Sequence, residues 1–235
     1  MTTFDSFGEF DNPVDHVAIP QAKKRYLRVK QWFDTIFASL GLIVLFPVLL
    51  LIALAVFIDD PKGGNPIFIQ DRLGKNMKKF KCLKFRTMNK KAPCDLATRQ
   101  FTDARKYITR HGAFLRKTSL DELPQLWNVI KGDMSLVGPR PLILAEADVH
   151  EKRRKQGIYA IKPGLTGLAQ INGRDLVDDV EKVDFDYSYL VNISPRLDFA
   201  IALGTLHKVI MMADIRDGKS IAEWNSPPID EEYKK

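Results

Sequence analysis

The longest uninterrupted run of apolar residues lies in the N-terminal third of the chain. Residues 35–58 contain no charged side chain. At about 1.5 Å per residue, a helix of this length extends roughly 35 Å, which is enough for a hydrocarbon core about 30 Å thick. The run starts too far from the N-terminus, and is too long, for a cleaved signal peptide. The pattern therefore predicts a membrane helix.

Two features favour a re-entrant helix over a simple span. Pro47 stands in the middle of the run, where it removes a backbone hydrogen bond and clashes with the preceding turn, so we expect a kink. Both flanks are basic, and the positive-inside rule places such flanks in the cytoplasm. A helix that enters, breaks at Pro47 and returns satisfies both flanks; a kinked spanning helix is the alternative, since membranes tolerate proline. The flanking cations are Lys23, Lys24, Arg25, Arg28 and Lys30 before the run, and Lys62, Arg72, Lys75, Lys78 and Lys79 after it.

Shorter apolar segments separated by turns predict an α+β domain that is predominantly helical. Residues 67–70 and 80–85 surround a turn at Gly74 and predict a small β-hairpin with a basic tip. A basic helix is expected over residues 92–117, and another over residues 119–130, closed by Gly132 at its C-terminal cap.

The C-terminal region carries apolar residues at helical spacing and predicts an amphipathic helix. Such a helix lies either in the core or flat in the membrane interface, and the pattern alone does not decide between them. The stripe consists of Phe199, Leu203, Leu206 and Ile210.

The expected organisation has five parts. Residues 1–20 form a polar tail, and residues 21–60 form the basic segment and re-entrant helix. Residues 61–195 form a cytosol-facing catalytic domain, residues 196–222 the amphipathic helix, and residues 223–235 a second tail. The whole is embedded in the membrane through the re-entrant helix and interfacial helices.

Charge is concentrated next to the membrane run. The chain has a net charge of +7, and residues 61–119 contain 16 Lys and Arg against 3 Asp. A block this dense favours an anionic partner: acidic headgroups, which contribute roughly 1 kcal/mol per cation near the surface, a nucleotide, or nucleic acid. A solvated face is the plain alternative.

Candidate chemistry concentrates around one acidic pair. Ser119 and Glu122 have the spacing of a capping box and Pro124 suits a first helical turn, so Asp121 and Glu122 are expected at a helix N-terminus. Two adjacent carboxylates there can approach a divalent cation, and Arg116 just upstream can hold a phosphate. The favourable interaction of acidic residues with the helix dipole explains the pair equally well.

Other motifs add little to this pair. The sequence contains no Walker-type loop, zinc-binding His pair or Gly-x-Ser-x-Gly elbow. Arg140 and Arg174 stand in Gly- or Pro-rich loops that suit bidentate phosphate contacts, with a surface ion pair as the alternative for each.

With these segments in view, the chain resembles the monotopic polyprenyl-phosphate phosphoglycosyl transferases, a family of bacterial sugar transferases. The resemblance covers about residues 30–210 and lacks the extra membrane helices of larger members. Phe46 departs from the Ser that the family often carries before the helix-breaking Pro, and Met77 stands near a usual second Gly of the hairpin loop. The matching stretches are residues 70–74, 84–88, 115–127, 132–141, 162–167 and 172–174, with a weaker match over Asp186, Tyr189 and Asp198.

The resemblance implies a catalytic dyad at Asp121 and Glu122. Asp121 would attack the β-phosphate of a nucleotide-diphosphate sugar, usually a UDP-hexose, and form a covalent phosphosugar that passes to polyprenyl (undecaprenyl) phosphate. This is the first membrane step of exopolysaccharide, capsule or glycan assembly. The family requires Mg²⁺, which Asp121 and Glu122 would bind, and Pro47 corresponds to its helix break. The implied phosphate-binding residues are Arg116, Arg140, Arg174, Lys84 and Arg86.

The resemblance also implies a location and partners. We expect the cytoplasmic face of the bacterial inner membrane, contact with its lipids, and no nucleic-acid partner; a homo-oligomer stays open. A membrane-anchored module that binds anionic lipid or nucleic acid without catalysis is the rival hypothesis. Transfer of the sugar without its phosphate is a third. Neither the sugar nor the polymer can be read from the sequence.

Overall fold

The computed structural model describes residues 19–92, 106–173 and 178–211. Within these ranges helices predominate and the sheets are small, which confirms the α+β prediction in its helical character and its hairpin. Arg174, residues 1–18 of the first predicted tail and the whole second tail lie outside the described residues. The main elements are α1 (Gln21–Asp59), β1 (Ile67–Leu73), β2 (Lys79–Phe85), α2 (Arg110–Thr118), α3 (Gln125–Lys131), β3 (Ser135–Val137), α4 (Ala147–Lys155), β4 (Gly164–Thr166), α5 (Leu168–Ile171), α6 (Asp179–Asn192) and α7 (Pro195–Met211).

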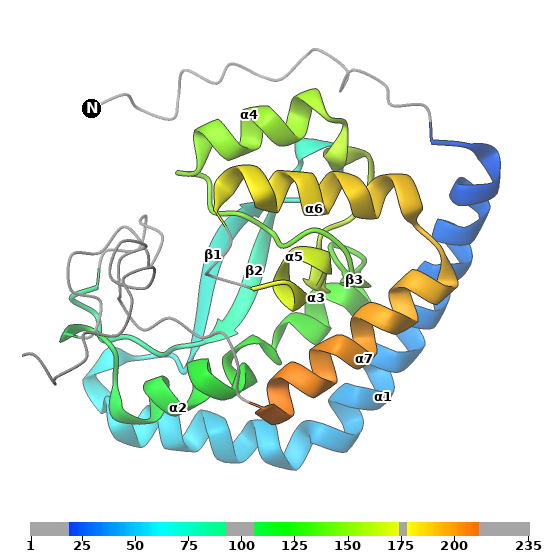
Figure 1. The fold of residues 1–235 in the computed structure, drawn as a ribbon. Helices are drawn as coiled ribbons and strands as arrows, with labels where there is room; N and C mark the ends of the chain where they lie inside the picture. Colours follow the sequence, from blue (N-terminus) through cyan, green and yellow to red (C-terminus); the bar gives the residue numbers. More distant parts are fainter. Residues whose placement is uncertain (1–18, 93–105, 174–177, 212–235) are drawn as a thin grey trace, which may run out of the picture.

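Helix α1 is a single helix of 39 residues that continues through Pro47. In Figure 1 it descends one side of the molecule and then bends to follow its base. By length and composition it could cross a membrane, and only 11% of its most apolar stretch is buried in the fold. The core helix of a soluble protein would instead be mostly buried. Its exposed large side chains include Trp32, Phe37, Ile43, Val44, Phe46, Leu50 and Leu51.

Strands β1 and β2 form the predicted hairpin, paired antiparallel from Ile67–Phe85 to Leu73–Lys79. Asn76 and Met77 at its tip have positive φ angles of 55° and 57°. Met77 therefore occupies a left-handed position for which glycine is the usual residue. A glycine at this position would adopt the same φ without steric strain.

Helix α3 is joined to the hairpin through one buried side chain. The Asn128 amide accepts a hydrogen bond from the Leu83 N–H (3.0 Å) and donates one to the Lys81 carbonyl (2.7 Å). Gly132 closes the helix with a φ of 85°, as predicted. The acidic pair lies just before α3, so the hydrogen bonds of Asn128 also fix the distance between the acidic pair and β2.

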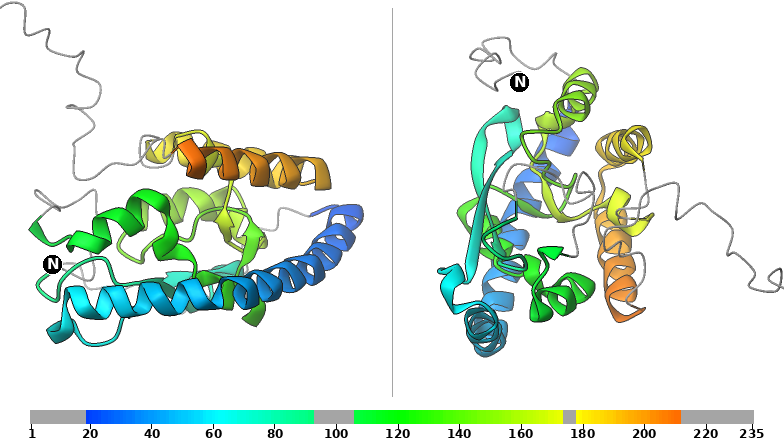
Figure 2. Two further views of the ribbon diagram at one scale, coloured as in Figure 1. Left: turned by 90° about the horizontal axis from the view of Figure 1, so that it is seen from below. Right: turned by 90° about the vertical axis from the view of Figure 1, so that its left-hand side faces the viewer.

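The remaining elements surround a second, parallel pair of strands, β3 and β4. Figure 2 shows the hairpin on one side of the domain and α6 and α7 on the other, with α1 along the base. One apolar core joins α4, α6 and α7 to β3, and two smaller ones pack α1 against the hairpin, α2 and α3. The site described below lies between these two sides.

A buried polar network fastens α1 to the domain. Lys30 lies 3.2 Å from Asp34 on its own helix and 3.1 Å from Asp198 on α7. Asp34 also accepts a hydrogen bond from the hydroxyl of Ser135 on β3 (2.5 Å). Tyr189 on α6 donates to the other Asp198 oxygen (2.7 Å). The first half of α1 is therefore anchored by charged and polar contacts.

Helix α7 settles one of the alternatives left open by the sequence. Phe199, Leu203 and Leu206 are 66%, 51% and 57% exposed, whereas Ile201 on another face is fully buried. The side chain of Ile210 lies outside the described residues. The stripe therefore does not pack into the core of this fold.

Candidate active site

The acidic pair lies in a single 3₁₀ turn, residues Leu120–Glu122, between two α-helices. The predicted capping box at Ser119 is wrong: its side chain caps no helix, and Ser119 instead ends α2 with a left-handed φ of 61°. The α-helix predicted over residues 119–130 starts only at Gln125, after Pro124. The basic helix predicted over residues 92–117 is likewise shorter in its described part and starts at Arg110, capped by Thr109. Asp121 and Glu122 are therefore buried residues of a tight turn and do not lie at the N-terminus of an α-helix.

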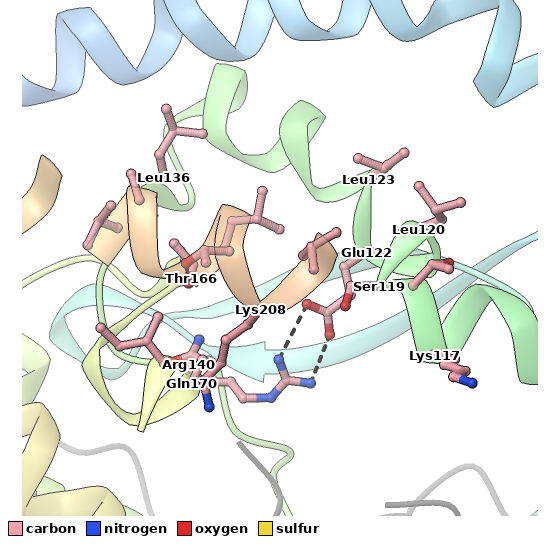
Figure 3. A pocket seen from close by; sticks show the side chains of 17 residues that line it. Lys117, Ser119, Leu120, Glu122, Leu123, Leu136, Arg140, Thr166, Gln170 and Lys208 are labelled. Atoms are coloured by element: carbon pink, nitrogen blue, oxygen red, sulfur yellow. Dashed lines mark hydrogen bonds and ion pairs between the residues drawn. The ribbon is translucent and has the colours of Figure 1, made fainter. Parts of the chain in front are cut away.

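Glu122 is held by two cations from distant parts of the chain. Its Oε1 atom accepts hydrogen bonds from Nζ of Lys84 on β2 and from a guanidinium nitrogen of Arg140 after β3, both at 2.8 Å. A second nitrogen of Arg140 lies 3.4 Å from Oε2, as the dashed lines of Figure 3 show. Burial alone would raise the pKa of Glu122, but the charges of Arg140 and Lys84 outweigh it and lower this pKa well below its usual range.

Asp121 has the opposite environment. It is 9% exposed, and no side chain or backbone group of the described ranges donates a hydrogen bond to its carboxylate. Burial, followed by the negative charge of Glu122, raises the pKa of Asp121 against the opposing charges of Lys84, Arg116 and Arg140. Adjacent carboxylates whose pKa values are pushed apart are typical of a site in which each has its own role.

The predicted phosphate-binding residues separate into three groups. Arg116, in the last turn of α2, is close enough to act on the charge of Asp121. Lys84 and Arg140 also reach the pair, but in this conformation both contact Glu122. Arg86 lies elsewhere, because it donates to the Asp60 carbonyl (2.8 Å) and closes the end of α1.

Two arginines donate hydrogen bonds to backbone carbonyls of the loop that carries Arg140. Arg153 on α4 donates to the Arg140 carbonyl (2.8 Å) and forms a buried ion pair with Asp186 on α6. Arg72 on β1 donates to the Pro141 carbonyl (3.1 Å). Sequence reasoning missed Arg153, and its only signal was the weak match at its partner Asp186.

A cavity of about 370 Å³ opens beside the pair, between α2, β3, β4, α5 and α7. Gln170 on α5, another residue that the sequence did not single out, lines it together with Arg140, and Figure 3 labels both. Both polar atoms of the Gln170 amide are buried and have no hydrogen-bond partner in the described ranges. A buried amide in this state costs about 1–3 kcal/mol, which a polar ligand can recover.

The residues fit a Mg²⁺ ion that is shared with a substrate. No group of three or more His, Cys, Asp and Glu residues suited to a metal occurs in the part of the chain that the structure describes. Mg²⁺, however, is usually bound by one or two carboxylates together with substrate phosphates. Asp121 has a carboxylate available for this, whereas Glu122 would first have to release one of its cations.

Comparison with known proteins identifies relatives over most of the chain. The "Uncharacterized sugar transferase" of Haemophilus influenzae is 43% identical over 196 residues, which cover 77% of this chain and 41% of that protein. The "Exopolysaccharide production protein ExoY" of Rhizobium meliloti is 39% identical over 197 residues, 77% of this chain and 85% of the relative. The "UDP-glucose:undecaprenyl-phosphate glucose-1-phosphate transferase" of Escherichia coli is 41% identical over 191 residues, 77% of this chain and 40% of the relative.

This chain therefore spans about two fifths of the Haemophilus and Escherichia proteins and most of ExoY. The family model described as "Bacterial sugar transferase" matches residues 25–212, which include α1, the acidic pair and the cavity. The chain belongs to the bacterial sugar transferase family.

Proposed function

We propose that this protein transfers a sugar-1-phosphate from a nucleotide-diphosphate sugar, specifically a UDP-hexose, to polyprenyl (undecaprenyl) phosphate. The names of the Escherichia relative and of the "Undecaprenyl-phosphate galactose phosphotransferase" of Salmonella typhimurium support this reaction class. The observation that carries the proposal is the contrast within the acidic pair: Glu122 is clamped by two cations, while Asp121 has its carboxylate available. The reaction would be the first membrane step of exopolysaccharide or glycan assembly.

The proposed reaction has two displacements at one phosphorus atom. An oxygen of Asp121 attacks the β-phosphorus of the donor, the bond from that phosphorus to the bridging oxygen breaks, and the nucleoside monophosphate leaves with the bond electrons. The polyprenyl phosphate oxygen then attacks the same phosphorus and displaces the Asp121 carboxylate. A covalent aspartyl intermediate divides one difficult transfer into two easier ones.

The cations around the pair reduce the repulsion between an anionic nucleophile and anionic substrates. Arg116 acts on the charge of Asp121, and Lys84 and Arg140 neutralise Glu122. A Mg²⁺ ion at Asp121 would neutralise charge on the donor phosphates. Arg86 and Arg174 remain predictions as phosphate ligands. Arg86 contacts the end of α1, and Arg174 lies outside the described residues.

The test is a screen of nucleotide sugars with polyprenyl phosphate and Mg²⁺, followed by analysis of both products. Nucleoside monophosphate and a diphosphate-linked lipid sugar are the expected products. Nucleoside diphosphate would instead indicate transfer of the sugar alone. No turnover with any donor, together with vesicle binding that falls steeply with salt, would favour the non-enzymatic lipid-binding module.

At a fixed Mg²⁺ concentration, the acid limb of the pH–rate profile is expected to depend on the charge of Glu122, the neighbour of Asp121. Asp121 must be ionised to attack, and burial together with the charge of Glu122 raises its pKa. In Glu122→Gln the neighbouring negative charge is lost while Lys84 and Arg140 stay, so the pKa of Asp121 falls and the limb moves to lower pH. Profiles of kcat/KM for both proteins measure this, and a limb at the same pH in both would assign it to another group.

The exposed apolar surfaces of α1 and α7 indicate membrane association, and we propose that α1 is re-entrant at the cytoplasmic face of the inner membrane. The bend of α1 and the basic residues on both sides of it support this topology. Contact with membrane lipids follows from it, while a homo-oligomer stays open.

In a cysteine-free background, cysteines at exposed Ala22 and Lys155 would report the two sides of α1. We expect an impermeant maleimide to label neither in intact cells and both in inverted membrane vesicles. Labelling of the Ala22→Cys variant in intact cells would show that α1 spans the membrane.

A further inference from the structure

The cavity beside the acidic pair has two chemically different parts. Most of its wall is aliphatic and comes from Leu120, Leu123, Leu136, Leu165, Ile171 and Val209. Its charged residues are Glu122 and Arg140, joined to each other, with Lys117 and Lys208. It is therefore an apolar chamber with cationic groups among its lining residues.

This lining is poorly suited to a nucleotide sugar. Sugar hydroxyls and a nucleobase each need hydrogen-bond partners, and burying such groups without them costs free energy. The Thr205 hydroxyl is already hydrogen-bonded to Thr166 (2.6 Å) and to the Ile201 carbonyl (2.8 Å). The aliphatic wall instead gains free energy by contact with hydrocarbon, at about 25 cal/mol per Å² of apolar surface buried.

A lipid phosphate has the complementary chemistry. Its hydrocarbon matches the aliphatic wall, and its phosphate matches the cations. The buried Nε2 atom of Gln170, which has no hydrogen-bond partner in the described ranges, is a donor that a phosphate oxygen can accept from. The phosphate would then lie next to the turn that carries Asp121, because Leu120 and Glu122 of that turn both line the cavity.

Helix α7 connects this chamber to the apolar exterior. Ala202, Thr205 and Val209 line the cavity, while Phe199, Leu203 and Leu206 on the same helix are exposed. A hydrocarbon chain leaving the cavity along α7 would pass from one apolar surface to another.

We propose that this cavity binds the polyprenyl phosphate acceptor, with its first isoprenyl units against the leucines and its phosphate toward Arg140 and Gln170. The proposal rests on the proposed function, since it assigns a place to the second substrate. It also separates the two substrates, because the donor would then approach Asp121 from outside this cavity.

The test fills the cavity without changing its charge. Ala202→Phe places a ring at the cavity wall, and Ala200→Phe is the matched control, since Ala200 is exposed on the same helix and does not line the cavity. Two reactions are compared in the full-length protein. The first is exchange of labelled nucleoside monophosphate into the nucleotide sugar without acceptor, and the second is transfer to polyprenyl phosphate or to geranyl phosphate, a short water-soluble acceptor.

For Ala202→Phe we expect exchange at the rate of the Ala200→Phe control, and a KM about tenfold or more higher for both acceptors, because small misfits in an apolar pocket already have effects of this size. Loss of exchange together with transfer would place the donor in the cavity and overturn the proposal. A defect with polyprenyl phosphate but none with geranyl phosphate would also overturn the proposal, since this result would indicate a changed position of the protein in the membrane. Failure of the proposed function is distinct, because the wild-type protein itself would then release no nucleoside monophosphate.

Discussion

Asp121→Asn is expected to abolish release of nucleoside monophosphate and its exchange into the donor, with a loss on the order of 10⁴-fold or more, as for other essential nucleophiles. The amide has nearly the shape of the carboxylate but cannot attack phosphorus. Both reactions should disappear together, because both pass through the same aspartyl intermediate. Steady-state release and isotope exchange, measured in parallel, check this result.

The same variant should be at least as stable as the wild-type protein. The folded state raises the pKa of Asp121 because burial and Glu122 both oppose its charge. A carboxyl group whose pKa is raised on folding binds protons more tightly in the folded state, so its ionisation lowers the stability as the pH rises through the normal and raised values. Asn removes this penalty. A thermal melt distinguishes loss of chemistry from loss of fold.

Asp148→Asn is a suitable control, since Asp148 is an exposed carboxylate in the first turn of α4. It should retain full activity. Acid-quenched wild-type protein mixed with donor should carry a phosphosugar on the peptide that contains Asp121, detectable by mass spectrometry. Normal turnover by Asp121→Asn would refute the proposed mechanism, even if such an adduct were found.

Arg153→Ala is expected to cause the largest loss of stability, about 3–5 kcal/mol, which is typical when one partner of a buried ion pair is removed. Arg153 and Asp186 have side chains that are 3% and 1% exposed. The substitution leaves the Asp186 charge buried and alone. It also removes the hydrogen bond to the Arg140 carbonyl, so transfer should fall as well. Unfolding in denaturant measures the first effect.

The neighbouring residue Lys155 offers the control, because its ion pair with Glu151 on the same helix is solvent-exposed. Lys155→Ala should change the stability by no more than about 1 kcal/mol. A double variant, Arg153→Met with Asp186→Leu, should recover stability, since an apolar pair avoids the buried charge. If it also recovered full transfer, the contact of Arg153 with Arg140 would have no part in activity.

The elements of this fold were predictable where the signal was local. A helix over the apolar run, the hairpin around Gly74 and the closure of α3 at Gly132 each depend on a short stretch of sequence, and these three elements are confirmed. The helix start at Ser119 was predicted wrongly for the same reason. The residues fit a capping box, but the end of α2 takes Ser119 into a left-handed conformation that the local pattern does not reveal.

The site was predictable in part. Asp121 and Glu122 could be identified as a pair, and Lys84 and Arg140 as cations, from the motifs. Both cations contact Glu122 rather than Asp121. This choice depends on tertiary packing, because Lys84 and Arg140 lie 38 and 18 residues away from Glu122 in the sequence. Gln170 gave no signal in the sequence, and Arg153 gave only the weak match at its partner Asp186, since the importance of both comes from what surrounds them in the folded chain.

The polar network between α1 and the domain bears on how the protein can be engineered for work without detergent. Deletion of α1 would expose the polar groups of Asp198, Tyr189 and Ser135 to solvent. It would also expose the apolar core residues that pack against α1. Helix α1 is thus required for the fold of the domain as well as for contact with the membrane. A water-soluble variant has to keep the helix and replace its exposed apolar residues, such as Trp32, Ile43 and Leu50, with hydrophilic ones.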